Sequence, residues 1–195
     1  MADMMKQNSD RIRQAMEMAE RYHDGQMRRG SHGDVPYYDE HILGVYRILH
    51  DECGVEEEDV LIIALLHDTV EDTSCTLEEI GEIFGTEIME QVNLLTRRDG
   101  EPFSVYSRRL FSQCSYKGVL VKLADRLHNL RTIVYMPDKR WIQKKVNQSY
   151  TDILNPLPDT LKRIDGRYND VINILADKIE DQILEVQRTL NLSHS

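Results

Sequence analysis

The sequence predicts an all-α protein, a helical bundle that ends in a long amphipathic helix. Apolar residues recur at the three- and four-residue spacing of helices along most of the 195 residues. Helix-capping patterns and turn-forming residues stand between these segments. A chain of this length can bury a substantial core. We therefore expect a single domain over 1–195, with its core over about 10–157 and a helical extension over about 159–192.

The first helix is predicted to begin after Ser9 and to end near Met27, with an apolar face that includes Ile12 and Ala19. Gly, Pro, Ser and Asp are frequent over 29–40, which predicts a loop. The next helices are expected over 41–53, 57–70, 77–85, 87–95 and 104–113.

Two of these helices carry a visible start signal. Thr76-Leu-Glu-Glu79 has the spacing of a capping box, in which the Thr and Glu side chains bond each other's backbone N–H groups. Gly85 is expected to end that helix, and Thr86 to cap the helix that follows. Residues 97–103 are expected to form a loop, and the order of 97–118 as a whole is left open.

From Asp159 to Leu192 apolar residues recur at helical spacing, which predicts one amphipathic helix. Gly166 weakens its start by about 1 kcal/mol relative to Ala. Two interpretations are open. Either the helix packs across the back of the domain, or it mediates a homodimer, because its spacing is close to a heptad repeat.

The apolar run Val60–Leu66 leads directly into residues that can bind metals or transfer protons. It is followed by His67, Asp68, Glu71 and Asp72, one imidazole and three carboxylates. On a helix His67 shares a face with Glu71, and Asp68 shares one with Asp72, because each pair is four residues apart. This arrangement predicts a metal site with its own acid–base group.

Two further segments carry residues of the same kind. A helix over 119–132 places Asp125 and Asn129 four residues apart, and His41 stands where a polar loop becomes an apolar helix. Two His and two Asp form a nitrogen and oxygen ligand set, which suits Mn²⁺, Fe²⁺ or Zn²⁺. The alternative is that His67 is a core histidine bonded to Asp125.

The remaining histidines are expected outside the site. His23-Asp24 and His50-Asp51 lie in mixed polar surroundings, which predicts solvated helix faces. His128 is expected to be a surface or packing residue. Trp141 and the tyrosines near position 37 are expected in the core or at a pocket rim.

Four residues resemble, in order and local context, the ligands of the HD superfamily of metal-dependent phosphohydrolases: His41, His67, Asp68 and Asp125. Two longer motifs resemble the hydrolase domain of the RelA/SpoT family, including the stand-alone small alarmone hydrolases: ALLHDTVEDT over 64–73 and KLADRLHNLRT over 122–132. That family uses an Mn²⁺-dependent hydrolase to remove the 3′-pyrophosphate from ppGpp or pppGpp, giving GDP or GTP. The resemblance therefore implies an HD-domain fold, one Mn²⁺ or another divalent transition metal per chain, and no synthetase domain.

The resemblance also implies roles for individual residues. The metal ligands would be His41, His67, Asp68 and Asp125. Glu71 and Asp72 match the pair that positions or activates the attacking water. Matching substrate contacts are Arg28, Arg29, Asn129, Arg131 and Thr132. The chemistry of phosphate binding adds Lys122 as a candidate clamp, and Tyr150 is a further candidate pocket residue.

Two departures from the family pattern bear on the substrate. Three residues separate Tyr37 from His41 where the family has two, so either the helix start shifts or Tyr38 takes the tyrosine position and Tyr37 stays unpaired. Residues 153–157 differ from the family's Ile-Tyr-Ala-Pro-Leu. Alternative substrates are therefore NADPH at its 2′-phosphate, an adenosine alarmone or a deoxynucleotide, and a non-catalytic nucleotide-binding HD module is the non-enzymatic alternative.

Composition limits the partners. The formal charge of −10 argues against a nucleic-acid or membrane surface, so we expect a small anionic nucleotide that is captured by a local basic cluster, Arg28-Arg29. Three cysteines without C-x-x-C spacing predict reduced thiols and a cytoplasmic location. No apolar run approaches the ~20 residues that a membrane span needs, and no signal peptide is expected.

Overall fold

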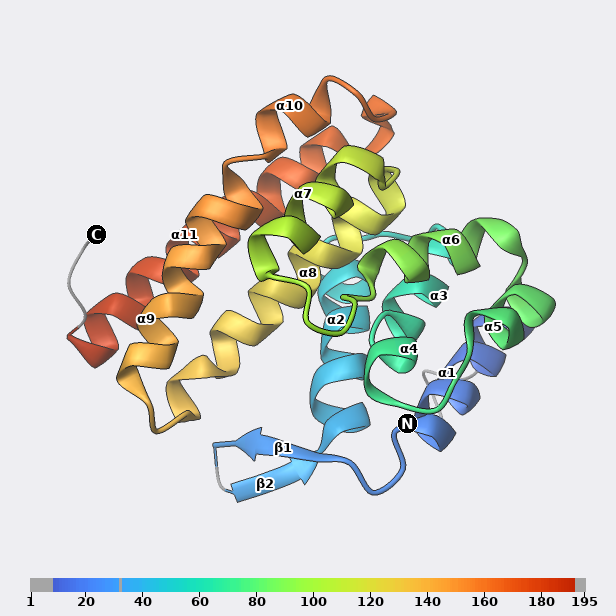
Figure 1. Cartoon of the computed structure of the whole chain (residues 1–195), viewed down its shortest axis with the longest axis horizontal. Helices are drawn as coiled ribbons and strands as arrows, with labels where there is room; N and C mark the ends of the chain where they lie inside the picture. The colour runs from blue at the N-terminus through green and yellow to red at the C-terminus, as the bar shows by residue number, and fades with distance from the viewer. Residues whose placement is uncertain (1–8, 32, 192–195) are drawn as a thin grey trace.

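The computed structural model describes residues 9–31 and 33–191 and consists of helices joined by short loops, with one small β-hairpin (Figure 1). The first half contains α1 (Asp10–Tyr22), β1 (Met27–Gly30), β2 (Gly33–Pro36), η2 (Tyr38–Ile42), α2 (Leu43–Arg47), η3 (Ile48–Glu52), α3 (Glu58–Leu66), α4 (Thr69–Asp72), α5 (Leu77–Phe84) and α6 (Thr86–Leu95). The second half contains α7 (Phe103–Gln113), α8 (Tyr116–Thr132), η4 (Ile133–Tyr135), α9 (Lys139–Gln148), η5 (Ser149–Leu154), α10 (Leu157–Leu161), η6 (Gly166–Tyr168) and α11 (Asn169–Leu190). The predicted all-α class is confirmed. The predicted limits at 1, 192 and 195 lie outside the described residues.

The segment after α1 differs from the prediction. Ser9 caps α1 as expected, but the helix ends at Tyr22, because Gly25 adopts a φ of 75° and turns the chain. The predicted loop over 29–40 is wrong in its first part, where β1 and β2 pair antiparallel with Met27 opposite Pro36. Neither strand alternates apolar and polar residues, so the sequence carries no strand signal here.

The helix that carries His41 begins with a π-helical turn. The segment η2 covers Tyr38–Ile42 and continues directly into α2. A π turn holds one residue more than an α turn, and such turns are frequent at functional sites. The extra residue between Tyr37 and His41 is thus taken up within the helix.

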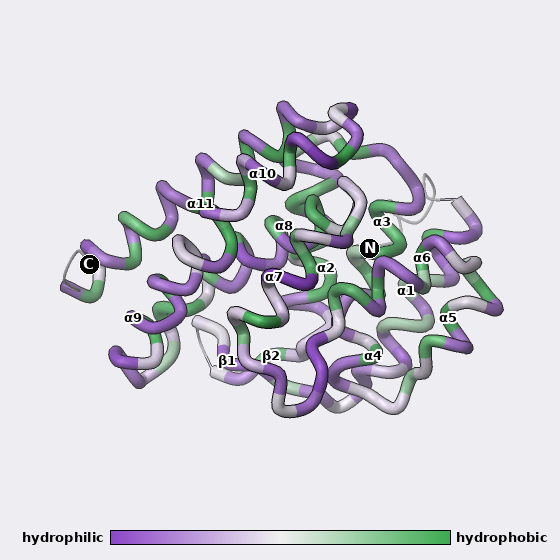
Figure 2. The backbone as a smooth tube through the Cα atoms, turned by 45° about the horizontal axis from the view of Figure 1, so that its top comes forward, coloured by the Kyte–Doolittle hydropathy of each residue, from purple (hydrophilic) through white to green (hydrophobic). Residues whose placement is uncertain are grey.

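The predicted helix over 57–70 is interrupted. Every residue of α3 from Val60 to Leu66 is buried, and Figure 2 shows this helix in the apolar colour. The helix ends at Leu66, and α4 begins only at Thr69. His67 and Asp68 therefore lie at a break, which directs both side chains into the same space.

The capping box is confirmed, and the cap of the following helix is not. Thr76 accepts a hydrogen bond from the backbone of Glu79, whose side chain accepts one from the backbone of Thr76. Gly85, with a φ of 92°, ends α5 and is itself the N-cap of α6. The expectation that Thr86 caps α6 was wrong, since Thr86 is the first residue inside the helix.

Residues 97–118 form defined elements. A short connection leads into α7, and Ser115 caps α8 by accepting a hydrogen bond from the backbone of Lys117. Most residues of α8 are buried, and the helix runs between the α1–α6 half and the later helices (Figure 1). One helix thus presents its faces to both halves.

The predicted continuous helix over 159–192 is wrong, because the chain breaks between α10 and α11. Asp165 caps η6, and Gly166 begins it. The apolar stripe of α11 is buried against α8, as the packed-helix interpretation predicted, and it joins the same apolar core. The homodimer and the division into core and extension stay predictions. None of the described helices is long and apolar enough to cross a membrane.

Candidate active site

Three side chains from two separate segments converge on one point of the structure. His41 comes from η2, and His67 and Asp68 come from the break between α3 and α4. One ligand atom from each lies within 4.8 Å of the other two. The two Nε2 atoms are 3.3 Å apart, and each lies close to Asp68 Oδ2, at 3.2 Å from His41 and 3.1 Å from His67.

Hydrogen bonds to the ring nitrogens orient the lone pairs toward this point. His67 Nδ1 donates a hydrogen bond to the carbonyl oxygen of Ala64 at 2.8 Å, so Nε2 is the ring nitrogen that faces Asp68 and His41. Burial alone lowers the pKa of His67, but the charge of Asp68 outweighs it and raises this pKa to about 9. The cluster thus stabilises positive charge, and its nitrogen and oxygen donors fit a divalent transition metal.

Asp125 lies beside this group on α8. Its Oδ1 is 3.4 Å from His41 Nε2 and also accepts a hydrogen bond from Asn129, while Oδ2 accepts one from Lys122 Nζ at 2.8 Å. The charge of Lys122 keeps the pKa of Asp125 far below its usual range despite burial. Asp125 is therefore an ionised oxygen donor adjacent to the three-residue group.

His128, expected to be a surface or packing residue, forms a hydrogen bond with the ring nitrogen of His41 that faces away from the cluster. Its Nδ1 lies 3.0 Å from His41 Nδ1, so one of the two nitrogens donates to the other. If His41 presents Nε2 to the cluster as a lone pair, its Nδ1 is the donor. A side chain at Gly44 would overlap the His128 ring, so only glycine leaves room for this contact. Orienting partners of this kind are general around metal-binding histidines.

Tyr37 contacts the cluster directly. Its hydroxyl donates to Asp68 Oδ2 at 2.6 Å, and its ring packs 5.1 Å from that of His41. The alternative in which Tyr37 stays unpaired was wrong, because the π-helical turn lets Tyr37 and His41 face the same carboxylate. His23, expected on a solvated face, is instead buried against the Tyr37 ring.

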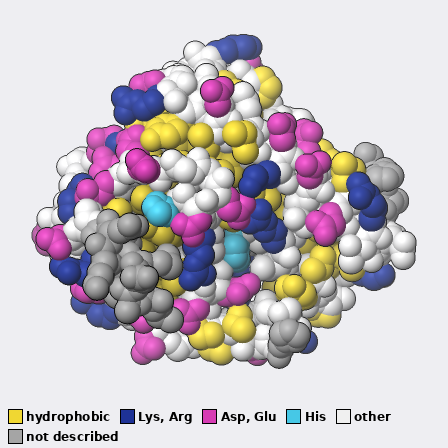
Figure 3. All heavy atoms as spheres, turned by 180° about the vertical axis from the view of Figure 1, so that it is seen from behind, with side chains coloured by type: hydrophobic (Ala, Val, Ile, Leu, Met, Phe, Trp, Pro, Cys, Tyr) yellow, Lys and Arg dark blue, Asp and Glu magenta, His cyan; other side chains and the backbone are white. Residues whose placement is uncertain are grey.

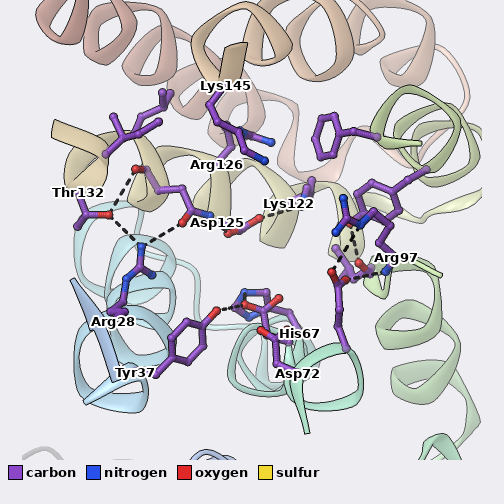
Figure 4. A pocket seen from close by; sticks show the side chains of 18 of the residues that line it. Arg28, Tyr37, His67, Asp72, Arg97, Lys122, Asp125, Arg126, Thr132 and Lys145 are labelled. Atoms are coloured by element: carbon purple, nitrogen blue, oxygen red, sulfur yellow. Dashed lines mark hydrogen bonds and ion pairs between the residues drawn. The ribbon is translucent and has the colours of Figure 1, made fainter. Parts of the chain in front are cut away.

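The two acidic residues of α4 line a cavity of about 250 Å³ next to the cluster (Figure 4). Burial, together with the charges of Asp68 and Glu71, raises the pKa of Asp72 to about 6. Burial also raises the pKa of Glu71, although the Arg97 backbone N–H donates to its carboxylate at 2.7 Å. Both carboxylates thus bind a proton more readily than an exposed carboxylate does.

Four of the predicted substrate contacts line the same cavity: Arg28, Lys122, Asn129 and Thr132. Arg28 donates to the side chains of Asn129 and Thr132 at 3.2 and 3.1 Å. Lys122, Asn129 and Thr132 follow one face of α8, since their spacing of seven and three residues matches the helical repeat.

Three other predicted contacts lie away from the cavity. Arg29 is exposed, because successive residues of a strand point to opposite sides and Arg28 already faces inward. Arg131 lies on a different face of α8 from the cavity residues and donates two hydrogen bonds to Glu52, of 2.6 and 2.9 Å. Tyr150 lies on η5 outside the lining, near the charge of Glu180.

The cavity includes lining residues that the sequence interpretation missed or did not assign: Arg97, Phe103, Tyr106, Arg126, Trp141 and Lys145. Trp141 is 41% exposed at the rim, as one interpretation predicted. Arg126 lies four residues from Lys122 on α8, so helical periodicity could have identified it. Leu154 and Asn155, whose departure from the family pattern opened the question of substrate, do not line the cavity.

Comparisons with known proteins identify relatives of this chain. The HD domain family matches residues 15–103. A guanosine-3′,5′-bis(diphosphate) 3′-pyrophosphohydrolase, MESH1 of Xenopus tropicalis, is 37% identical over 149 residues, which is 73% of this chain and 82% of the relative. Its Homo sapiens counterpart is 35% identical over 75% of this chain and 82% of its own length. A solved structure described by the words "A metazoan ortholog of SpoT hydrolyzes ppGpp and plays a role in starvation responses" matches with a TM-score of 0.69 and 26% identity, over 95% of this chain and 98% of the other.

Proposed function

This chain belongs to the HD-domain family of the MESH1 3′-pyrophosphohydrolases, and from that premise we propose that it hydrolyses guanosine 3′,5′-bis(diphosphate) to GDP and pyrophosphate. The observation that supports this most is the convergence of His41, His67 and Asp68 beside a cavity that is also lined by further carboxylates and by cations. An HD hydrolase requires a divalent metal, and this group can provide its ligands.

We propose Mn²⁺ as that metal and Asp125 as its fourth ligand. Support comes from the mixed nitrogen and oxygen donors, since no thiolate lies among the described candidates. A divalent metal bound there would polarise a phosphoryl oxygen and lower the pKa of water from 15.7 to about 7. Tyr37 and His128 would hold Asp68 and His41 in place through the contacts described above.

The reaction breaks the bond between the ribose 3′-oxygen and the adjacent phosphorus. A water oxygen bonds to that phosphorus, pyrophosphate departs, and the 3′-oxygen gains a proton. Glu71 would orient the water and take its proton, with Asp72 beside it. Lys122 and Arg28 would hold phosphoryl oxygens, and the guanidinium of Arg28 offers a planar pair of donors.

Substitutions separate metal binding from the chemical step. His67→Ala or Asp125→Ala should lose bound metal and turnover of ppGpp together, because each removes a ligand. Glu71→Gln should keep the metal and lose at least about 100-fold in kcat, the usual contribution of a general base. Metal content by atomic emission and product formation by ion-exchange chromatography would check this. Full turnover in Glu71→Gln would remove Glu71 from the assigned role.

Three further expectations belong to the proposal. We propose a cytoplasmic location, which the free thiols of Cys53, Cys75 and Cys114 support. A small anionic nucleotide is the proposed partner. A homodimer through 159–192 is retained as a proposal, although the apolar stripe that suggested it packs against α8.

A further inference from the structure

The end of α6 is held by side chains of α7, above all by the guanidinium of Arg109. Its Nη2 and Nη1 atoms donate to the backbone oxygens of Thr96 at 2.9 Å and Leu94 at 3.4 Å. The Tyr106 hydroxyl, also on α7, donates to the backbone oxygen of Leu95 at 2.6 Å. The last carbonyl groups of a helix lack partners within the helix and attract positive charge. Side chains of α7 therefore cap the C-terminus of α6.

The same guanidinium also holds the far part of the α6–α7 connection, through Glu101. The Nε and Nη2 atoms of Arg109 donate to the two carboxylate oxygens at 3.0 and 2.9 Å, and the two side chains are only 13% and 9% exposed. The Glu101 carboxylate in turn accepts the backbone N–H of Arg98 at 3.1 Å. A two-point pair of this kind fixes orientation as well as distance. Arg109 thus holds the chain on both sides of Arg97.

The backbone N–H of Arg97 is the group that lies between these two contacts. It donates to Glu71 Oε2 at 2.7 Å, and the Nε atom of the Arg97 side chain lies 3.8 Å from Oε1. Arg97 lines the cavity beside this carboxylate (Figure 4). An ionised carboxylate has about four lone-pair sites, so Glu71 can accept this bond and still accept a proton from another group.

The element that carries Glu71 gives its carboxylate little support. The helix α4 is a single turn of four residues, and one turn is not stable by itself. Across residues 9–31 and 33–191, no other group donates a hydrogen bond to this carboxylate. The orientation of Glu71 therefore depends on the α6–α7 connection.

We propose that Arg109 is a positioning residue of the reaction, which holds the Arg97 N–H against Glu71 and so orients the general base. The inference rests on the proposed function, in which Glu71 takes the proton of the attacking water. Arg109 is not among the residues that line the cavity, so it acts through Glu71 and not through contact with the substrate. Arg108, next to it, is exposed and donates to the backbone oxygen of Ser104 in its own helix, which makes it a matched control.

The kinetic test compares Arg109→Lys with Arg108→Lys. Both keep the positive charge, but only the first removes a planar set of donors that the connection uses. We expect Arg109→Lys to lower kcat for ppGpp about tenfold, because a displaced base transfers the proton poorly, and to leave KM within about twofold. Arg108→Lys should match the wild type. Equal effects of the two substitutions would overturn the inference.

A double substitution shows whether Arg109 acts through Glu71. Glu71→Gln removes the base, so its orientation no longer matters, and adding Arg109→Lys should then cause no further loss of kcat. A further loss of about tenfold in the double variant would mean that Arg109 acts by another route, and would overturn the inference.

The pH profile of kcat separates positioning from a general loss of structure. Burial raises the pKa of Glu71, and the hydrogen bond from the Arg97 N–H opposes this shift. A weaker bond should raise this pKa further, so the acidic limb of the profile should move up by about one pH unit in Arg109→Lys. The charged groups around Glu71, which neither lysine variant changes, are Asp68, Asp72, Arg97 and Lys122. An unmoved limb would overturn the inference.

Amide hydrogen exchange separates this inference from the proposed function. The Arg97 amide is followed by NMR in metal-free wild type, Arg108→Lys, Arg109→Lys and Glu101→Gln, each checked for folding by circular dichroism. We expect exchange about tenfold faster in the last two, because each weakens the ion pair that protects this N–H, and no change in Arg108→Lys. Glu101→Gln carries the test if Arg109→Lys does not fold.

The outcomes of the exchange measurement are distinct from those of the activity assay. Faster exchange in Arg109→Lys and Glu101→Gln alone supports the hold on the bond to Glu71 even if the wild type leaves ppGpp intact, which would refute only the function. Normal hydrolysis of ppGpp by the wild type, with unchanged exchange in both variants, refutes only the positioning role of Arg109.

Discussion

The side chains around His41 show how local packing at single residues determines the chemistry of the cluster. Asp68 is bound by Tyr37 and lies beside both imidazoles, while His128 holds the far nitrogen of His41. Gly44 is the residue that permits this last contact. The roles of these neighbours could not be derived from residue spacing, because they depend on a π-helical turn and on the absence of one Cβ atom.

Gly44→Ala should therefore weaken metal binding without unfolding the protein. The new methyl group overlaps His128 Nε2 and displaces the ring that orients His41. We expect the affinity for Mn²⁺ to fall about tenfold, as for other losses of an orienting partner. Isothermal titration with Mn²⁺ measures the change.

Gly81→Ala is the matched control, since a Cβ in that helix would meet Met89 only at 3.6 Å. It should keep the metal affinity and slightly stabilise α5, by up to about 1 kcal/mol. Equal affinities in the two variants would show that His128 does not position His41.

At the scale of elements, periodicity predicted the long helices well and the short ones poorly. The stripe of α8 that carries Asp125, Asn129 and Thr132 follows directly from helical spacing. The hairpin could not be predicted, because β1 has neither alternation nor β-branched residues. This omission is why the sequence did not indicate that the Arg29 side chain faces outward, an orientation that follows from the segment being a strand.

The break before α11 was also not predicted, because it too depends on local backbone geometry that residue spacing does not report. Apolar spacing continued through Gly166, while the cap formed by Asp165 and the flexibility of glycine allowed the chain to turn. Spacing indicates which residues face the core, but not whether the backbone between them is continuous. The apolar residues after the break nevertheless pack as predicted.

Ile179→Ala tests the packing of α11. The Ile179 side chain is fully buried, so its truncation should lower the free energy of unfolding by about 3 kcal/mol. Ile174→Ala on the same helix removes a side chain that is 48% exposed and should change it by less than about 0.5 kcal/mol. Urea unfolding followed by circular dichroism gives both values. Similar losses in the two variants would contradict the observed orientation of the helix.

At the scale of the whole molecule, the local distribution of charged side chains matters more for substrate binding than the net charge of −10. Acidic and basic side chains are interspersed on the face shown in Figure 3, whereas the cavity concentrates cations opposite the acidic cluster. An anionic substrate can thus bind to an acidic protein, because the charges that it meets are those of the cavity wall.

One ion-pair network joins three distant segments and predicts a pH dependence of stability. Glu52 at the end of η3 binds Arg131 on α8 and Lys178 on α11, and these bonds lower its pKa from 4.5 to about 2 despite partial burial. A lowered folded-state pKa stabilises the protein above pH 4.5, and this contribution disappears as the pH falls toward 2.

Glu52→Gln should accordingly lower the free energy of unfolding by about 1 kcal/mol at pH 7, a value reduced for the partial exposure of the pair. The difference from the wild type should shrink below pH 4.5 and vanish near pH 2. Urea unfolding at several pH values measures it. A difference that stays constant with pH would mean that Glu52 contributes to stability through packing and not through its charge.

The central claim, a metal-dependent 3′-pyrophosphohydrolase, is tested most directly by a product-resolved turnover assay. Metal-free and Mn²⁺-loaded protein is offered ppGpp, pppApp, NADPH and a deoxynucleoside triphosphate, and the products are separated by ion-exchange chromatography. The predicted result is GDP and pyrophosphate from ppGpp, formed only by the loaded protein. Orthophosphate from NADPH with ppGpp intact, or no turnover of ppGpp despite bound metal, would contradict the claim.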